Sequence, residues 1–288
     1  MAAVLNFSHS YFSSQLNVSP VPSIAQLEES VNREEFKKKD LVGVNATVYV
    51  PLPKYFKKQS ASSLSQYDVW YYLREGNDTE KVTAHHYDDL FKYQGQIYEF
   101  LVHDVLEYQG HRELASKALS WINGKGKNNK STLVWDMGAG HGPDIQELRG
   151  NGFKGKVVGI DVCEPAKRSH YSDMPYTTHK YDDYFLGKAS KSDEIKSALN
   201  APPDLLIVGT VTPPDGAVED VREIVDKMPS GGCVVINLPV NKDDSCQNMY
   251  QYLENSQNLR LQESSIYQHR LHMDGQPMDM RIQTYVVL

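Results

Sequence analysis

The sequence predicts an α/β protein with a doubly wound, mostly parallel sheet, a C-terminal β-hairpin and an N-terminal helical cap. Short apolar segments alternate with helical segments between residues 132 and 255. A glycine-rich turn follows the first of these apolar segments. The chain ends in two apolar stretches joined at Asp274-Gly275, a typical hairpin turn. Alternation of strands and helices is typical of a parallel sheet that is covered on both faces.

The expected core strands are short and rich in branched apolar residues: 132–136, 156–161, 176–180, 204–209 and 233–238. Helices are expected at 218–228 and 244–255, and the hairpin strands at 264–272 and 280–287. Upstream, apolar residues recur at helical spacing from 83 to 122, and Gly95 and Gly110 divide this region into consecutive helices. The predicted domains are an N-terminal extension or lid (1–80), a helical cap (81–125) and a core (126–288).

Charge and cysteine content restrict the function classes. The formal net charge is -7, whereas nucleic-acid-binding proteins usually present a basic face. The three cysteines are scattered and show no metal-ligand spacing, and no apolar run reaches the ~20 residues of a membrane span. We therefore expect a cytoplasmic protein with a small-molecule substrate and no metal, nucleic-acid or membrane partner. The sequence leaves the oligomeric state open.

The strongest motif is Asp136-Met-Gly138-Ala-Gly140-His-Gly142, which lies between an expected strand and a helix starting near Pro143. Glycines at such a turn allow the backbone to approach a ligand closely. The start of the next helix adds unpaired N–H groups and the positive end of its dipole.

A carboxylate follows at the spacing expected for a ribose contact. Asp161 ends the second strand, 161 − 142 = 19 residues after the last glycine, where it can accept hydrogen bonds from both ribose hydroxyls. Dinucleotides and S-adenosylmethionine both fit this arrangement. Three features favour S-adenosylmethionine: the D-x-G-x-G-x-G spacing, the central position of the motif after a helical segment, and the closing hairpin.

From about residue 80 onward the chain resembles class I S-adenosylmethionine-dependent methyltransferases. The resemblance lies in WDMGAGHGP, GIDVCEP, DLLIVGTVTP and MPSGGCVVINLP. It is closest to the Williams–Beuren-region methyltransferase-like family, in which a helical segment containing a Tyr-Asp pair, like Tyr87-Asp88 here, also leads into the glycine motif. The first 65 residues match no family that we recognise.

The resemblance implies cofactor contacts at the ends of the expected strands and in the cap: Tyr87, Tyr93, Asp136, Gly138, Ala139, Gly140, Asp161, Val162, Asp182, Gly209 and Thr210. Asp136 and the glycines would line the aminoacyl part. Asp161 would hold the ribose, Val162 would flank the adenine, and Asp182 (or Asp183) would contact the adenine amino group. Gly209 and Thr210 would face the methionine portion and the reacting methyl group.

The expected catalytic residues are His85, His86, Tyr87 and Thr210, with a surface helix start as the alternative reading of the histidine pair. His269 and His272 on the predicted hairpin could reach the rim of the substrate site. Methyl transfer is an in-line displacement, which depends mainly on positioning and needs a base only when the nucleophile holds its proton tightly.

The predicted function is S-adenosylmethionine-dependent methyl transfer to an amine, hydroxyl or thiol of a small molecule, with S-adenosylhomocysteine as product. An amine is preferred because the 18 tyrosines could include an aromatic cage. The alternatives are a non-catalytic methyltransferase-like binding protein and an NAD-dependent oxidoreductase. An RNA methyltransferase is disfavoured by the acidic balance and by GTVTPP after the fourth strand, where an NPPY-type sequence would be expected.

Overall fold

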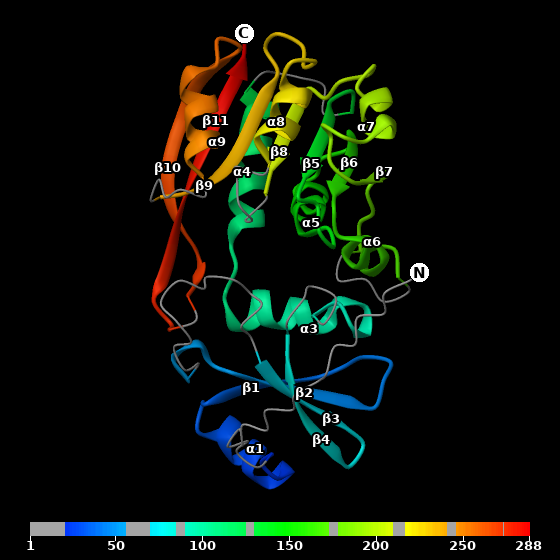
Figure 1. Cartoon of the computed structure of the whole chain (residues 1–288), viewed down its shortest axis with the longest axis vertical. Helices are drawn as coiled ribbons and strands as arrows, with labels where there is room; N and C mark the ends of the chain where they lie inside the picture. Colours follow the sequence, from blue (N-terminus) through cyan, green and yellow to red (C-terminus); the bar gives the residue numbers. More distant parts are fainter. Residues whose placement is uncertain are drawn as a thin grey trace, which may run out of the picture.

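The protein contains two sheets with a helical segment between them (Figure 1). The computed structural model describes residues 21–55, 70–84, 90–124, 130–172, 178–209, 217–240, 246–272 and 274–288. In Figure 1 the seven-stranded sheet lies above and the four-stranded sheet below, with α3 between the two.

The large sheet has the order β10-β11-β9-β8-β5-β6-β7. Its parallel strands are β5 (Leu133–Met137), β6 (Lys156–Asp161), β7 (Asp183–Leu186), β8 (Leu205–Val208) and β9 (Cys233–Pro239). Two antiparallel strands extend it beyond β9: β10 (Leu259–Leu271) and β11 (Pro277–Val287). The last strand is inserted between β9 and β10, so both strands of the hairpin belong to the main sheet. This confirms the predicted fold class.

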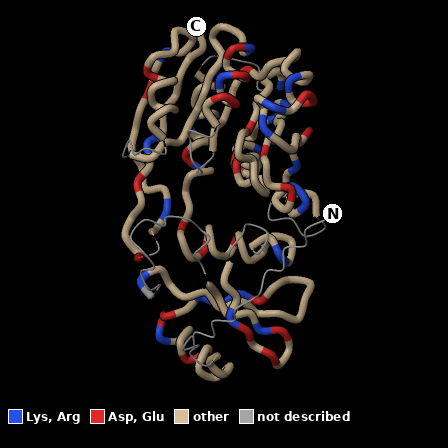
Figure 2. Tube along the Cα trace, in the orientation of Figure 1, with Lys and Arg blue, Asp and Glu red and all other residues tan. Residues whose placement is uncertain are grey.

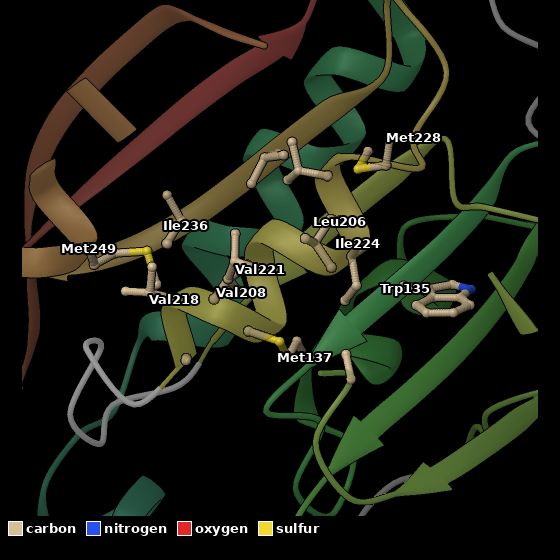
Figure 3. Close-up of a cluster of buried hydrophobic side chains, with 14 of the residues drawn as sticks. Trp135, Met137, Leu206, Val208, Val218, Val221, Ile224, Met228, Ile236 and Met249 are labelled. Carbon is tan, nitrogen blue, oxygen red and sulfur yellow. The ribbon is translucent and has the colours of Figure 1, made fainter. Parts of the chain in front are cut away.

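Helices cover both faces of the large sheet. One face packs against α4 (Gly110–Gly124) and α5 (Pro143–Gly150) through a cluster that includes Val134, Val157, Leu205 and Val235. The other face meets three helices: α7 (Asp193–Ala198), α8 (Val218–Val225) and α9 (Gln247–Asn255). Figure 3 shows this second cluster, where Leu206 and Ile236 from the strands meet Val221 of α8. Burial of these branched side chains on both faces explains why the core strands are continuously apolar.

The N-terminal unit is an antiparallel sheet in the order β1-β2-β3-β4. Its elements are α1 (Ile24–Asn32), β1 (Phe36–Asp40), β2 (Ala46–Pro51), the 3-10 turn η1 (Pro53–Tyr55), β3 (Trp70–Glu75) and β4 (Asp78–Thr83). One face packs on the segment formed by η3 (Tyr93–Gly95), α3 (Gln96–Glu99) and η4 (Phe100–Val105). Val48, Tyr71 and Leu73 of the sheet lie against Ile97 and Leu101 of that segment. The unit therefore has its own apolar core.

Two sequence expectations change. Residues 36–83 contain a four-stranded sheet, of which the strand pattern at 42–50 revealed only one member, β2. The third core strand is β7, and residues 178–182 precede it as irregular chain, so the strand expected at 176–180 is wrong in the part that the structure describes. The other expected core strands and the hairpin are confirmed within a few residues. Within the described ranges, no helix is both long and apolar enough to span a membrane.

Candidate functional site

Strand order places a ligand-binding edge at the carboxyl ends of β5 and β8. From β5 the chain continues to β6 and β7 on one side, and then crosses to β8 and β9 on the other. In open α/β sheets, ligands bind beyond the carboxyl ends of the strands at such a switch point. The glycine turn follows β5 and Gly209 follows β8, so both lie at this edge.

The glycine turn has backbone angles that favour glycine at three positions. The φ angles of Gly138, Gly140 and Gly142 are 87°, 52° and 98°. A side chain at Gly142 would place its Cβ 2.6 Å from Nδ1 of His170. This ring accepts the Tyr181 N–H at Nε2, so its Nδ1 donates to the His141 carbonyl at 2.8 Å. The His170 ring therefore holds the turn in place by this hydrogen bond, and it fits there because Gly142 has no side chain.

Asp161 closes one side of the turn. Its Oδ2 accepts the Gly140 N–H at 2.8 Å, and its Oδ1 accepts the Cys163 N–H at 2.8 Å. Burial raises the pKa of this carboxyl, and the backbone N–H groups act in the opposite direction. A carboxylate has about four acceptor positions, so those that the backbone N–H groups leave open can bind ligand hydroxyls. The next side chain, Val162, is 65% exposed and presents an apolar surface at the same edge.

Two acidic residues lie buried beneath the turn. Asp136 is fully buried: its Oδ2 accepts the Tyr181 hydroxyl at 2.5 Å, and its Oδ1 has no hydrogen-bond partner among the described residues. Burial raises its pKa to about 7. Asp144, in the first turn of α5, is also buried, and its Oδ1 likewise lacks a described partner. Burial raises the pKa of Asp144 well above its usual range, and the nearby Asp136 carboxyl adds a smaller effect in the same direction.

Asp144 also borders Gly209. A Cβ at Gly209 would lie 3.4 Å from Leu114 and 3.9 Å from Oδ2 of Asp144. By contrast, a Cβ at Gly140 would meet only the Gly138 carbonyl oxygen, at 3.9 Å. The turn is therefore open above Gly140 and closely lined at Gly209, and Ala139 between the glycines is buried in the sheet core.

The structure does not place the predicted cap residues at this edge. His85, His86, Tyr87 and Thr210 lie outside the described residues. Tyr93 packs on the small sheet, and its hydroxyl donates to Glu75 of β3, so the structure does not support its predicted cofactor contact. A tyrosine that the sequence did not single out lies against the glycine turn: the Tyr98 ring is 5.2 Å from the ring of His141.

Asp182 requires a correction. Because β7 begins at Asp183, Asp182 precedes the strand instead of following it, and its N–H donates to Val157 near the start of β6. Its carboxylate accepts the Val157 N–H at 2.7 Å and pairs with Arg149 at 2.9 Å. It lies at the opposite edge of the sheet from Asp161, about four residues or ~13 Å along the strands. Its role is structural, and the predicted adenine contact is wrong.

A polar network on β9 and β10 was not anticipated as a unit. The Tyr267 hydroxyl bonds Oδ1 of Asn237 at 2.9 Å and Nδ1 of His269 at 2.8 Å. His269 is fully buried, and its ring lies 4.8 Å from that of Tyr108, edge to face. The i, i+2 spacing of Tyr267 and His269 places both on one face of a strand. The sequence offered that signal, but not the position of Asn237.

Two further histidines surround Tyr108. His111 stacks on the Tyr108 ring at 5.3 Å, and His103 lies 5.0 Å from His111, edge to face. Burial lowers the pKa of His103 to about 4, and those of His111 and His269 to about 3, so all three rings are neutral near pH 7. No group of described residues meets the geometry of a metal site.

Comparisons with known proteins give only distant likenesses. No protein-family model matches the sequence, and no curated protein matches it. Among solved structures, magnesium protoporphyrin IX methyltransferase from Synechocystis PCC 6803 with bound S-adenosylmethionine is 14% identical, with 62% of this chain and 80% of that chain covered and a TM-score of 0.43.

Two other solved structures are similar at the same level. A candidate RNA methyltransferase from Pyrococcus horikoshii is 14% identical over 62% of this chain and 84% of that chain, with a TM-score of 0.45. The O-methyltransferase TomG from Streptomyces achromogenes is 16% identical over 61% and 89%, with a TM-score of 0.40. The resemblance to the Williams–Beuren-region family remains a prediction.

Proposed function

We propose that this protein is an S-adenosylmethionine-dependent methyltransferase acting on a small molecule. The observation that supports this most strongly is the pair of buried acids, Asp136 and Asp144, directly beneath a glycine turn that faces Asp161. S-adenosylmethionine has a ribose with two hydroxyls, a cationic sulfonium, a cationic amino group and a carboxylate, and its net charge is positive. Asp161 provides a carboxylate for the ribose hydroxyls, and the buried acids Asp136 and Asp144 suit the cationic groups.

The same acids argue against a dinucleotide. A pyrophosphate would need the positive end of α5 and its unpaired N–H groups. Here the helix starts with Pro143, which has no N–H, and Asp144 brings a carboxyl group to the first turn. A bound pyrophosphate would oppose the ionisation of Asp136 and Asp144, whose pKa values burial already raises, whereas a cationic amino group would favour it.

The residues of the edge fit S-adenosylmethionine by position. Asp161 would accept both ribose hydroxyls while keeping its bonds to Gly140 and Cys163. Val162 would pack on the adenine. Asp136 would face the amino group with Oδ1, which has no hydrogen-bond partner in the described part of the chain. When bound, the cofactor would supply an electrophilic methyl group on sulfur. The protein would hold the acceptor in line with it, close to Gly209, which is the larger part of catalysis for such displacements.

The proposal also specifies the methyl acceptor, which we expect to be a small molecule and not a nucleic acid. The net charge of -7 supports a small-molecule acceptor. Figure 2 adds that Lys and Arg are interspersed with Asp and Glu along both units. Nucleic-acid binding depends on many phosphate contacts by clustered cations. The extension 1–80 and the cap 81–125 are proposed to determine which acceptor enters, since appended elements commonly provide specificity.

Titration calorimetry on an Asp161→Ala variant tests the proposal. Wild-type protein should bind S-adenosylmethionine and S-adenosylhomocysteine with micromolar affinity. Loss of the ribose contacts should weaken binding by about 3 kcal/mol, on the order of a hundredfold. Glu164→Ala is the matched control, because it removes a neighbouring exposed carboxylate that pairs only with Arg168 among described residues. Unchanged affinity in Asp161→Ala, with melting temperature preserved, would contradict the assignment.

A further inference from the structure

The network of Asn237, Tyr267 and His269 fixes a proton position. A tyrosine hydroxyl has one hydrogen, and that of Tyr267 is donated to Oδ1 of Asn237. Toward His269 the same hydroxyl must then accept, so Nδ1 of His269 bears the ring hydrogen. The other ring nitrogen, Nε2, is left with a lone pair. If the Asn237 amide were turned round, Tyr267 would accept from Nδ2 and donate to Nδ1 of His269, and the hydrogen would then be on Nε2. The two arrangements therefore differ in a tautomer that can be measured.

The network reaches the ligand-binding edge through Asn237. Val208 of β8 pairs with Ile236 of β9, so Asn237 lies beside Gly209. It also lies on the same face as Val235, which is the face covered by α4 and α5. The network is thus on the β8–β9 side of the switch point, whereas Asp161 is on the β6 side. A ligand held at its ribose by Asp161 would direct its other end toward Gly209 and the network.

Two polar atoms of the network are buried without a described partner. Nε2 of His269 can accept a hydrogen bond and Nδ2 of Asn237 can donate one, and their residues are 0% and 1% exposed. Leaving such groups buried without a partner is unfavourable. An acceptor and a donor joined by one tyrosine suit a ligand group that both gives and receives a hydrogen bond.

The surrounding charges and rings narrow the ligand class further. When a cationic cofactor holds Asp136 or Asp144 in the ionised form, the negative charge disfavours an anionic nucleophile such as a thiolate. A protonated amine could bond Nε2 but would have no lone pair left for the methyl group. A neutral hydroxyl has both a hydrogen and lone pairs. A neutral amine has them too, but the acids Asp136 and Asp144 would favour its protonated form. The rings of Tyr108, His111 and His269 favour a flat, apolar scaffold around the hydroxyl.

We propose that His269, oriented by Tyr267 and Asn237, receives the proton of a hydroxyl group on a small, uncharged aromatic acceptor. This inference rests on the proposed methyltransferase function. The hydroxyl oxygen forms a bond to the methyl carbon, the carbon–sulfur bond breaks, and its electron pair remains on sulfur as a neutral thioether. The hydroxyl proton passes to Nε2 of His269, and the imidazolium later releases it to solvent.

The low basicity of the buried ring does not prevent this step. Burial lowers the pKa of His269 to about 3, which makes it a weak base toward a free hydroxyl. Once the oxygen has gained a methyl group it is positively charged, and it is then a stronger acid than the imidazolium. Proton transfer therefore follows or accompanies bond formation, and the ring mainly receives a proton that is already being expelled.

Nitrogen NMR on protein with ¹⁵N-labelled histidine rings tests the tautomer and the contact. Wild-type protein saturated with S-adenosylhomocysteine should show His269 as the Nδ1–H tautomer, and Tyr267→Phe should lose that preference. Phenol should shift the Nε2 signal, and anisole, which lacks the hydroxyl hydrogen, should not. An Nε2–H tautomer in the wild type, or the same response to both probes, would overturn the proposal.

Affinity measurements separate this inference from the proposed function. His269→Phe should bind S-adenosylhomocysteine as the wild type does but bind phenol about tenfold more weakly, the loss expected for one hydrogen bond. His272→Phe, on the same hairpin and outside the network, is the matched control. Equal phenol affinity in His269→Phe and wild type would refute the role of His269. Failure of the wild type to bind S-adenosylhomocysteine would refute the proposed function instead.

Discussion

Replacement of Asp136 by asparagine should stabilise the ligand-free protein at pH 8. Burial raises the pKa of this carboxyl from 3.8 to about 7, so the native state keeps its proton to a higher pH than the unfolded chain does. Between about pH 4 and 7 the native state binds more protons, and stability therefore falls as the pH rises. Above pH 7 the full cost of a buried charge is present, and asparagine removes it.

The pKa shift of Asp136 determines how much stability the Asp136→Asn variant should gain. About three pKa units correspond to a ceiling of about 4 kcal/mol, at 1.36 kcal/mol per unit. The Tyr181 hydroxyl stabilises the ionised form and loses some of that benefit with asparagine, so about 2 kcal/mol is the expected gain. In a chain of this size that corresponds to roughly 4–8 °C in melting temperature.

Urea unfolding at two pH values is the appropriate assay. Asp136→Asn should unfold at a higher urea concentration than the wild type at pH 8, and at nearly the same concentration at pH 4.5. Asp78→Asn, an exposed acid on β4, is the control and should change little at either pH. A variant less stable than the wild type at pH 8 would refute the reasoning, because it would mean that the native fold stabilises the charged carboxyl.

Two further predictions concern the frame of the site. Asp182→Ala should destabilise the fold by about 2 kcal/mol through loss of the Val157 contact, while S-adenosylmethionine affinity stays unchanged by calorimetry; a large loss of affinity would restore the adenine role. Gly142→Ala should cost at least about 2 kcal/mol in urea unfolding, since its Cβ would meet His170 and its φ is positive. Gly152→Ala has a similar φ and open space, so it should cost about 1 kcal/mol; equal losses would exclude the ring contact.

The core could be predicted because its signals are local. Strand 156–161 and the closing hairpin follow from apolar runs bounded by turn residues, and they are observed nearly as expected. The glycine turn and Asp161 followed from spacing, and the structure joins them through the Gly140 N–H. Strand β7 was misplaced because its four residues are too short to show a period, and two tyrosines and two acids surround its start.

The rest of the site depends on contacts between distant segments, which a single sequence does not reveal. Asn237 and Tyr267 are 30 residues apart, and only the pairing of β11 between their strands brings them together. Tyr98 reaches the glycine turn because α3 packs on the small sheet, a unit that sequence periodicity did not reveal. Buried acids such as Asp144 look like ordinary residues of a helix start until their burial is known.

Competition between two ligands on the wild-type protein tests the central claim most directly. Calorimetry at pH 8 should show that S-adenosylmethionine binds and that NAD, at the same concentration, neither produces a binding signal nor displaces it. This outcome is expected because a cationic ligand favours the ionisation of the buried acids Asp136 and Asp144, and a pyrophosphate opposes it. Binding of NAD in preference to S-adenosylmethionine would contradict the account.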